Sequence, residues 1–257
     1  MPRSRLSLAR RQILAMIAIG AASVPLRGRV LHPLRAFAFD AFVLFNPEVV
    51  VKRAREIAGD EKGAALVRAA SAKLFGYTWY YTSAGRYAEF DELAAGAFSS
   101  AAQGLGFKLN RAETDRLVDG YTHLDLWQDV PDALETLRHH GIRLAMLSNL
   151  AERTLRANLR ANGIDQHFEF VLSTDKAREY KPSQAAYDLA VRAFNAPREE
   201  IGFAASASWD ASGATWFGFP TVWVNRTGAP IEEALARPVL VSTGTDGVLQ
   251  MASLDRL

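Results

Sequence analysis

Four places in the sequence carry polar side chains that could take part in catalysis, each at or soon after a predicted strand. They are Asp40, the pair Ser148 and Asn149, Lys181, and Asp210. In open parallel α/β sheets the carboxyl ends of the strands line the ligand crevice, so these side chains should gather at one edge of the sheet. A carboxylate in an apolar run is costly unless hydrogen-bond donors surround it. Asp40 therefore stands where a reactive group would be expected; the alternative is a turn residue that closes a strand.

The elements that must position these side chains alternate between helix and strand. The first strand is Ala36–Phe39, an apolar run suited to burial on both faces. Such alternation predicts an α/β fold with a doubly wound parallel sheet and helices on both of its faces. After Val130 the predicted helices are 131–140, 152–162, 183–194, 210–217, one near 232 and one from 246, and the predicted strands are 143–147, 168–172, 200–204, 221–224 and 239–242.

A helical segment interrupts this alternation. Residues 48 to about 121 show the three- and four-residue apolar spacing of helices and no strand signal. Pro47 and Glu48 favour a helix start, and Asn110 and Thr114 are candidate caps for the last helix of the segment. We therefore predict an α/β core of residues 31–47 and 125–257 with an inserted helical cap at 48–124.

Composition excludes several classes of site. The chain has 257 residues, of which 49% are hydrophobic and 23% charged, as in a globular protein. The absence of cysteine excludes disulfides, thiolate chemistry and cysteine metal sites. The five histidines show no metal-binding spacing, so a histidine metal site is not expected.

Residues 1–30 have the pattern of an export leader. Basic residues come first, and Arg10 and Arg11 precede the apolar run Ile13–Ala22, which is too short to span a membrane. This pattern resembles a twin-arginine signal. We predict cleavage between Ser23 and Arg29 and a periplasmic or secreted product without stable membrane insertion; the alternative is a cytoplasmic protein with an N-terminal extension.

The basic character of the chain belongs to that leader. It contains six arginines and no acid, and without those six charges the formal net charge falls from +2 to −4. The basic pI therefore does not indicate a nucleic-acid-binding surface.

The polar residues at the strand ends occur within three longer segments that resemble one known family. The segments are LSNL at 147–150, YKPSQAAY at 180–187 and WDASGATWFGFPTVWVNRTG at 209–228. Together with Asp40 they resemble the haloacid dehalogenase (HAD) superfamily, and within it the type II branch, the L-2-haloacid dehalogenases. The resemblance extends from about Arg35 to Asn225.

The resemblance implies a role for each catalytic candidate. Asp40 would displace the halide and form an ester, which water would then hydrolyse. Lys181 would pair with Asp40 and hold it ionised, and Asp210 would hold Lys181 or position the water. Ser148 would bind the substrate carboxylate or Asp40, and Asn149 would direct its amide at the halide.

The resemblance also implies substrate-binding residues. Phe42 and Trp209 would be apolar walls of the halide site, and Tyr187 matches a tyrosine near the family's active site. The family places an arginine six residues before a Tyr-Thr-Trp sequence, where this chain has Ser71. Arg68, one helical turn earlier, is the nearest arginine and becomes the candidate.

The chain departs from the family at further positions. The family's threonine after the nucleophile is missing, and Val43 and Leu44 follow Phe42 in its place. The family's serine and asparagine in the last motif fall on Ala205 and Ala207. Loss of an oriented amide could slow hydrolysis by roughly two or three orders of magnitude.

The expected function is a cofactor-free hydrolytic dehalogenase of short (S)-2-haloalkanoic acids, giving (R)-2-hydroxy acids. The rivals are a catalytically weak or non-catalytic carboxylate-binding protein of the same fold and a Mg²⁺-dependent phosphatase. The phosphatase branch needs a second acid two residues after the nucleophile, where this chain has Phe42. The aromatic run Tyr77–Tyr81 is interpreted as cap packing or a homodimer surface, or alternatively as the substrate entrance.

Overall fold

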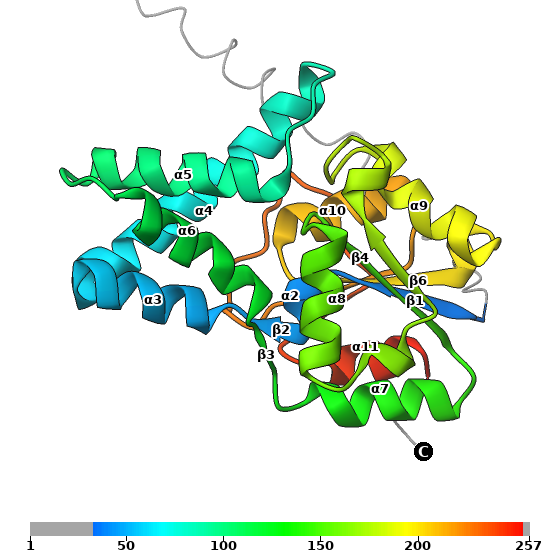
Figure 1. Ribbon diagram of the computed structural model, residues 1–257. Coiled ribbons are helices and arrows are strands. Elements are labelled where there is room, and N and C mark those ends of the chain that lie inside the picture. The colour runs from blue at the N-terminus through cyan, green and yellow to red at the C-terminus, as the bar shows by residue number, and fades with distance from the viewer. Residues whose placement is uncertain (1–32, 254–257) are drawn as a thin grey trace, which may run out of the picture. The chain divides into compact units, whose positions relative to one another are not determined.

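Six parallel strands form the central sheet (Figure 1). The structure is a computed structural model and describes residues 33–253, so the predicted leader lies outside the described residues. The strand order is β5-β4-β1-β6-β7-β8, which reverses direction at β1 and confirms the doubly wound prediction. The strands are β1 (Ala36–Phe39), β4 (Arg143–Ser148), β5 (Phe170–Ser173), β6 (Ile201–Ala205), β7 (Thr221–Val224) and β8 (Leu240–Ser242).

Helices cover both faces of the sheet because successive strand side chains point to opposite sides. Phe37 and Phe39 face the core shared with α7 (Val130–His139), α8 (Glu152–Ala161) and α11 (Asp246–Met251). Ala36 and Ala38 face a second core, shared with α9 (Gln184–Phe194) and α10 (Ser208–Phe217). Short 3₁₀ helices are η1 (Gly120–Thr122), η2 (Asp165–His167), η3 (Thr174–Lys176) and η4 (Arg198–Glu200).

The helical insertion lies between two very short strands. After β1 comes a single turn, α2 (Ala41–Leu44), and then β2 (Phe45–Asn46), which pairs antiparallel with β3 (Asp125–Leu126). Between β2 and β3 lie α3 (Glu48–Ala58), α4 (Asp60–Ser83), α5 (Phe90–Gly104) and α6 (Arg111–Asp119) (Figure 1). The described residues, 33–253, fall within one compact unit, so the division of this unit into a core and a cap domain stays a prediction.

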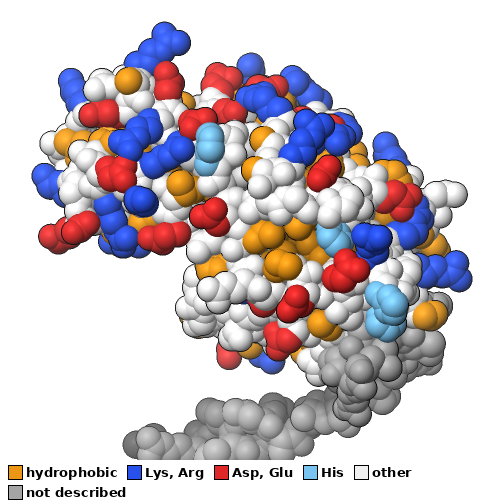
Figure 2. Space-filling view, turned by 60° about the horizontal axis from the view of Figure 1, so that its bottom comes forward, with side chains coloured by type: hydrophobic (Ala, Val, Ile, Leu, Met, Phe, Trp, Pro, Cys, Tyr) orange, Lys and Arg blue, Asp and Glu red, His pale blue; other side chains and the backbone are white. Residues whose placement is uncertain are grey.

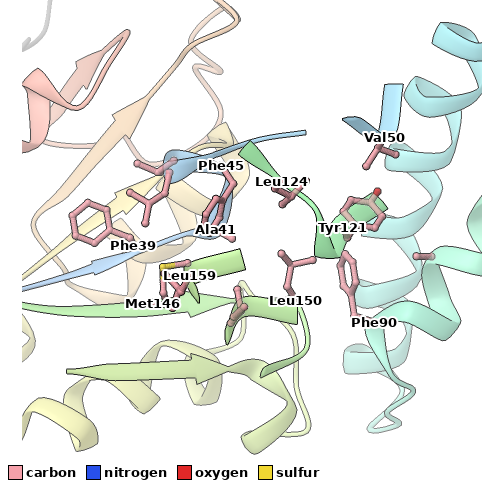
Figure 3. Close-up of a cluster of buried hydrophobic side chains, with 14 of the residues drawn as sticks. Phe39, Ala41, Phe45, Val50, Phe90, Tyr121, Leu124, Met146, Leu150 and Leu159 are labelled. Carbon is pink, nitrogen blue, oxygen red and sulfur yellow. The ribbon is translucent and has the colours of Figure 1, made fainter. Parts of the chain in front are cut away.

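A continuous apolar cluster joins the insertion to the sheet. Figure 3 shows Phe39 and Met146 on the strands and Val50, Phe90 and Tyr121 on the helical side of this cluster. The backbone N–H of Trp127 also donates to the carbonyl of Leu44 at 3.0 Å, and its indole N–H donates to the carbonyl of Phe42 at 3.2 Å. The chain leaving the insertion is thus bonded to the turn that follows β1.

Two predictions of local structure are corrected. Asn110 caps α6 in a capping box with Glu113, as predicted, but Thr114 lies inside that helix and donates its hydroxyl to the carbonyl of Asn110 at 2.9 Å. The helix predicted near Glu232 is a turn. Prolines at 230 and 238 leave too few residues between them for a stable helix.

The surface carries charges of both signs. Figure 2 shows one face, on which Lys and Arg side chains are interspersed with Asp and Glu. Within residues 33–253 no helix is both long and apolar enough to cross a membrane.

Candidate active site

Asp40 lies directly after β1, at the point where the strand order of the sheet reverses. Its backbone N–H donates to the carbonyl of Ala204 on β6 at 2.9 Å, which extends the β1–β6 pairing by one residue. Its Oδ2 accepts the backbone N–H of Phe42 at 3.1 Å and the hydroxyl of Ser206 at 2.7 Å. Its Oδ1 accepts one hydrogen bond, from Lys181 at 2.9 Å. The donors expected around a buried carboxylate are therefore present, and Oδ1 retains more free lone-pair capacity than Oδ2.

Lys181 bridges two carboxylates. Its Nζ lies 2.9 Å from Asp40 Oδ1 and 2.7 Å from Asp210 Oδ2, and its side chain is 1% exposed. Burial opposes the charged form, but the charges of Asp210 and Asp40 outweigh this effect and raise the pKa of Lys181 above its usual value. Lys181 is therefore a cation, and it lies between two carboxylates, so the three groups together carry a net charge of −1 when both carboxylates are ionised.

Asp210 is the more deeply buried of the two carboxylates. Burial raises its pKa from 3.8 to about 6, although the charge of Lys181 lowers it. Both of its oxygens are occupied, since Oδ2 accepts from Lys181 and Oδ1 accepts the hydroxyl of Tyr187 at 2.7 Å. Gly213 lets α10 approach so closely, because a Cβ there would lie 2.6 Å from the Tyr187 hydroxyl.

This geometry corrects the role expected for Tyr187. Its side chain is fully buried in the second core, among Phe203, Phe217 and Phe219, and it does not line the pocket beside Asp40. Tyr187 therefore contacts Asp210 rather than a substrate. The resemblance to the family placed it near the site but could not show which side of Asp210 it occupies.

The pKa of Asp210 predicts a pH dependence. Halide release should rise with pH through about 6, because protonated Asp210 loses the ion pair by which it holds Lys181 in position beside Asp40. The folded pKa exceeds the unfolded one, so between 3.8 and about 6 the folded state holds a proton that the unfolded chain has released, and stability from this group falls as pH rises. Tyr187→Phe removes a hydrogen bond that lowers the pKa of Asp210. The rise of kcat/KM with pH should therefore occur at higher pH in this variant than in the wild type. A pH profile of kcat/KM that is identical in both proteins would contradict this role.

Ser148 and Asn149 form the polar end of the site. Asn149 Oδ1 accepts the backbone N–H of Lys181 at 3.0 Å, which fixes the orientation of the amide. Its Nδ2 is buried and has no hydrogen-bond partner among the described residues. Ser148 Oγ accepts the backbone N–H of Leu150 at 3.3 Å and makes no hydrogen bond to Asp40. A buried donor without a partner is costly, so the Asn149 amide is suited to receive an anionic or polar group of a ligand.

A small pocket connects these groups. Its volume is about 20 Å³, which is room for roughly one water molecule. The residues Asp40, Ser148, Asn149, Lys181 and Asp210 line it together, so the structure brings the five catalytic candidates to one place.

The walls of the pocket are largely aromatic. Phe42 and Trp209 line it as the resemblance implied, and Phe75 and Phe90 from the helical insertion join them. The Phe75 and Trp209 rings lie 5.1 Å apart between centroids, so α4 contacts α10 across the site. The pocket therefore combines charged groups with walls that exclude water.

Arg68 is not one of the lining residues, which corrects its place among the substrate-binding candidates. Ser71, at the family's arginine position, lines an adjoining cavity instead. Among the residues that line the pocket, Lys181 is the only cation, because no arginine from the insertion takes part. Residue spacing along a helix does not show whether the side chain of Arg68 extends as far as the pocket.

Ser206 was not among the residues predicted for the site. It follows β6 directly, where the strand-end rule predicts polar side chains. The family's own polar residues in this motif fall on the neighbouring positions, Ala205 and Ala207. Ala205 packs in the second core and Ala207 lines the pocket. Leu44 is fully buried in the first core, and the hydroxyl beside Asp40 comes from Ser206.

The charged residues of the site also bear on whether it could hold a metal ion. Within the part of the chain that the structure describes, no group of three or more His, Asp or Glu side chains is placed to hold a metal ion. The charged cluster at the site consists of two carboxylates and one lysine.

Known proteins show the same arrangement of sequence and fold. A family model described as a haloacid dehalogenase-like hydrolase matches residues 34–218. An (S)-2-haloacid dehalogenase from Pseudomonas sp. (strain YL) is 34% identical over 219 residues, covering 85% of this chain and 94% of that protein. Haloacetate dehalogenase H-2 from Moraxella sp. (strain B) is 32% identical over 225 residues, 87% of this chain and 100% of that protein.

The fold gives the same result. A crystal structure of an L-2-haloacid dehalogenase superimposes with a TM-score of 0.83 at 33% identity, covering 86% of this chain and 100% of the other. Sequence and fold therefore agree over most of the chain. The chain belongs to the HAD superfamily, in its L-2-haloacid dehalogenase family.

Proposed function

We propose that this chain is a hydrolytic dehalogenase of (S)-2-haloalkanoic acids that produces (R)-2-hydroxy acids without a cofactor. The observation that carries the proposal is Lys181, which bridges Asp40 and Asp210 at the edge of the sheet where ligands bind. The relatives named above act on 2-haloacids and on haloacetate, which supports this substrate class. The domain division at residues 47/48 and 124/125 is part of the same proposal.

In the first step Asp40 Oδ1 attacks C2 of the substrate. A carbon–oxygen bond forms, the carbon–halogen bond breaks, and the halide leaves with the bonding electron pair while C2 inverts. Lys181 Nζ lies 2.9 Å from the attacking Oδ1 and pairs with it. The Asn149 amide supplies a hydrogen bond to the halide or the carboxylate, and Phe42 and Trp209 exclude water from the leaving group.

In the second step water attacks the carbonyl carbon of the Asp40 ester. Oδ2 is then the carbonyl oxygen, and negative charge develops on it. The backbone N–H of Phe42 and the hydroxyl of Ser206 already donate to Oδ2, so they act as an oxyanion hole. The acyl–oxygen bond breaks, one proton of the water passes to Oδ1, which leaves as the hydroxyl of the hydroxy acid, and the other proton is released to solvent. The water oxygen remains on Asp40 as part of the restored carboxylate. Because both oxygens of Asp210 are occupied, it holds Lys181 rather than the water.

Ser206→Ala is expected to slow the hydrolysis step by about two to three orders of magnitude, the usual cost of one oxyanion-hole donor. Ester formation depends less on this hydroxyl, so the esterified enzyme should accumulate. Intact-protein mass spectrometry during turnover measures that accumulation. Ser208→Ala, at a nearby half-buried serine whose hydroxyl donates to Glu232, serves as the control. A Ser206→Ala enzyme that turns over normally without ester would contradict the assignment.

A second candidate function rests on the substituted positions. Ser71, Ala205 and Ala207 replace three polar residues of the family, and this favours a weak or non-catalytic protein that binds carboxylates in the same pocket. The phosphatase alternative is opposed by Phe42, which offers no acid for a leaving alcohol.

Halide release from the two enantiomers of 2-chloropropionate separates these functions. The dehalogenase proposal expects halide and (R)-lactate from the (S)-enantiomer. Binding of propionate with no halide from either enantiomer supports the non-catalytic candidate instead. Release of phosphate from phosphate monoesters would favour the phosphatase.

Two further properties belong to the proposal. Export through the residue 1–30 leader would give a mature N-terminus between Ser23 and Arg29, and recovery of intact Met1 only from the cytoplasm would count against it. A homodimer is supported by exposed aromatic rings on α4 and α10, namely Trp79, Tyr80 and Trp216. Sedimentation of a monomer at micromolar concentration would argue against the dimer.

A further inference from the structure

A second cavity opens next to the catalytic pocket. It has a volume of about 200 Å³ and lies where α3 and α4 meet the turn after β1 and the start of α10. Phe42, Phe75, Phe90, Ser206 and Ala207 line both the pocket and this cavity, so the two are adjacent across shared side chains. A group attached to a carbon beside Asp40 can therefore extend into it.

The lining of this cavity is apolar and uncharged. Val50, Val51, Val67 and Leu74 from the insertion contribute aliphatic surface. None of its lining residues is charged. Figure 3 shows Val50, Phe90 and Tyr121 on the helical side of the apolar cluster, where they help to enclose it. Such a space suits hydrocarbon and is a poor site for water or an ion.

Ser71 determines how much of this space is open. It lies on α4 and lines the cavity together with Val67, one turn earlier, and Leu74, about one turn later. A serine side chain is short, so a large side chain at position 71 would fill part of the cavity. The polar groups that can orient a substrate, Ser148 and Asn149, line the pocket but not the cavity.

We propose that the cavity receives an apolar substituent on C2 of the substrate, so that the preferred substrates are 2-haloalkanoic acids with a chain of about four to six carbons on that atom. A cavity of about 150 Å³ can hold benzene, so one of 200 Å³ has room for a butyl group. The carboxylate and halide then remain at the polar end, beside Asn149. This inference rests on the proposed function for the chemistry, while the cavity itself can be tested by binding alone.

The test compares 2-chlorohexanoate with 2-chloropropionate, which differ by three methylenes and have similar chemistry at C2. Each buried methylene improves binding about fourfold, so kcat/KM should be at least about tenfold higher for the hexanoate. Hexanoate should also bind at least about tenfold more tightly than propionate by calorimetry, a readout that needs no turnover.

Two variants on α4 sharpen the comparison. Ser71→Leu narrows the cavity and should reduce both ratios toward one. Ala72→Leu adds the same side chain at the next position, which is exposed, and should leave both ratios unchanged. Melting curves of each variant show whether it folds. If Ser71→Leu does not fold, the hexanoate-to-propionate ratios of the wild type alone test the cavity proposal.

The outcomes separate the two proposals. Tighter binding of hexanoate with no halide from either chloroacid supports the cavity and contradicts the dehalogenase. Halide from 2-chloropropionate with neither ratio above one leaves the dehalogenase standing and overturns the cavity proposal. If a folded Ser71→Leu variant keeps the wild-type ratios, the cavity proposal is also overturned, since the alkyl chain would then lie outside the cavity.

Discussion

Asp40→Asn is expected to reduce halide release by at least about four orders of magnitude, as removal of a catalytic nucleophile does in other enzymes. The amide has the size of the carboxylate and can still accept the hydrogen bond from Lys181. It lacks the negative charge that makes Oδ1 a nucleophile. Halide release and intact-protein mass are the measurements, and no ester should form on the variant.

The control for this variant is another aspartate outside the site. Asp132→Asn changes an exposed residue in the first turn of α7 and should leave halide release unchanged. Peptide mass analysis of residue 40 excludes reversion of Asn to Asp as a source of activity. An Asp40→Asn protein that keeps more than about a hundredth of wild-type activity would remove Asp40 from the role of nucleophile.

Lys181→Met is expected to lower the unfolding free energy by about 3–5 kcal/mol, the cost of breaking a buried ion pair by removing one partner. The variant leaves Asp40 and Asp210 buried, 6% and 1% exposed, without the cation that lies between them. Halide release should also fall by about three orders of magnitude, because Asp40 loses the cation that lies 2.9 Å from its attacking oxygen. Urea denaturation and halide assays measure the two effects.

A double variant separates the effect of Lys181 on stability from its effect on halide release. Asp210→Asn in the Lys181→Met background removes one of the two unbalanced carboxylates, so part of the lost stability should return while activity stays low. The stability loss of Lys181→Met should also shrink as the pH falls, because Lys181 lowers the pKa of Asp210 and its removal lets Asp210 take up a proton more readily. A single variant as stable as the wild type across this pH range would mean that the bridge is not a stabilising ion pair.

The strand-end rule accounts for most of the site that sequence could predict. Apolar runs identify β1 and β4, and the polar residues after them, Asp40 and Ser148, lie beside the pocket. Lys181 is different, because seven residues lie between it and Ser173 at the end of β5. Its segment was found through the resemblance to a family, since no periodic pattern marks a loop residue.

Other features of the site depend on side-chain direction, which spacing does not give. Ser206 supplies the hydroxyl beside Asp40 although the neighbouring positions, Ala205 and Ala207, have lost polar groups. Tyr187 was placed near the site by the resemblance to the family, but it approaches Asp210 from the buried side. Arg68 belongs to the same helix as Ser71 and still does not line the pocket.

The most direct test of the aspartyl-ester mechanism is a single turnover of (S)-2-chloropropionate by excess enzyme in H₂¹⁸O. If Asp40 forms an ester and water attacks its carbonyl carbon, the lactate carries no heavy oxygen and the peptide that contains Asp40 gains it. If water attacks C2 directly, with Asp40 acting only as a base, the heavy oxygen appears in the lactate and Asp40 stays unlabelled. The first result is the one that the geometry of Asp40, Lys181 and Ser206 predicts, and the second would contradict it.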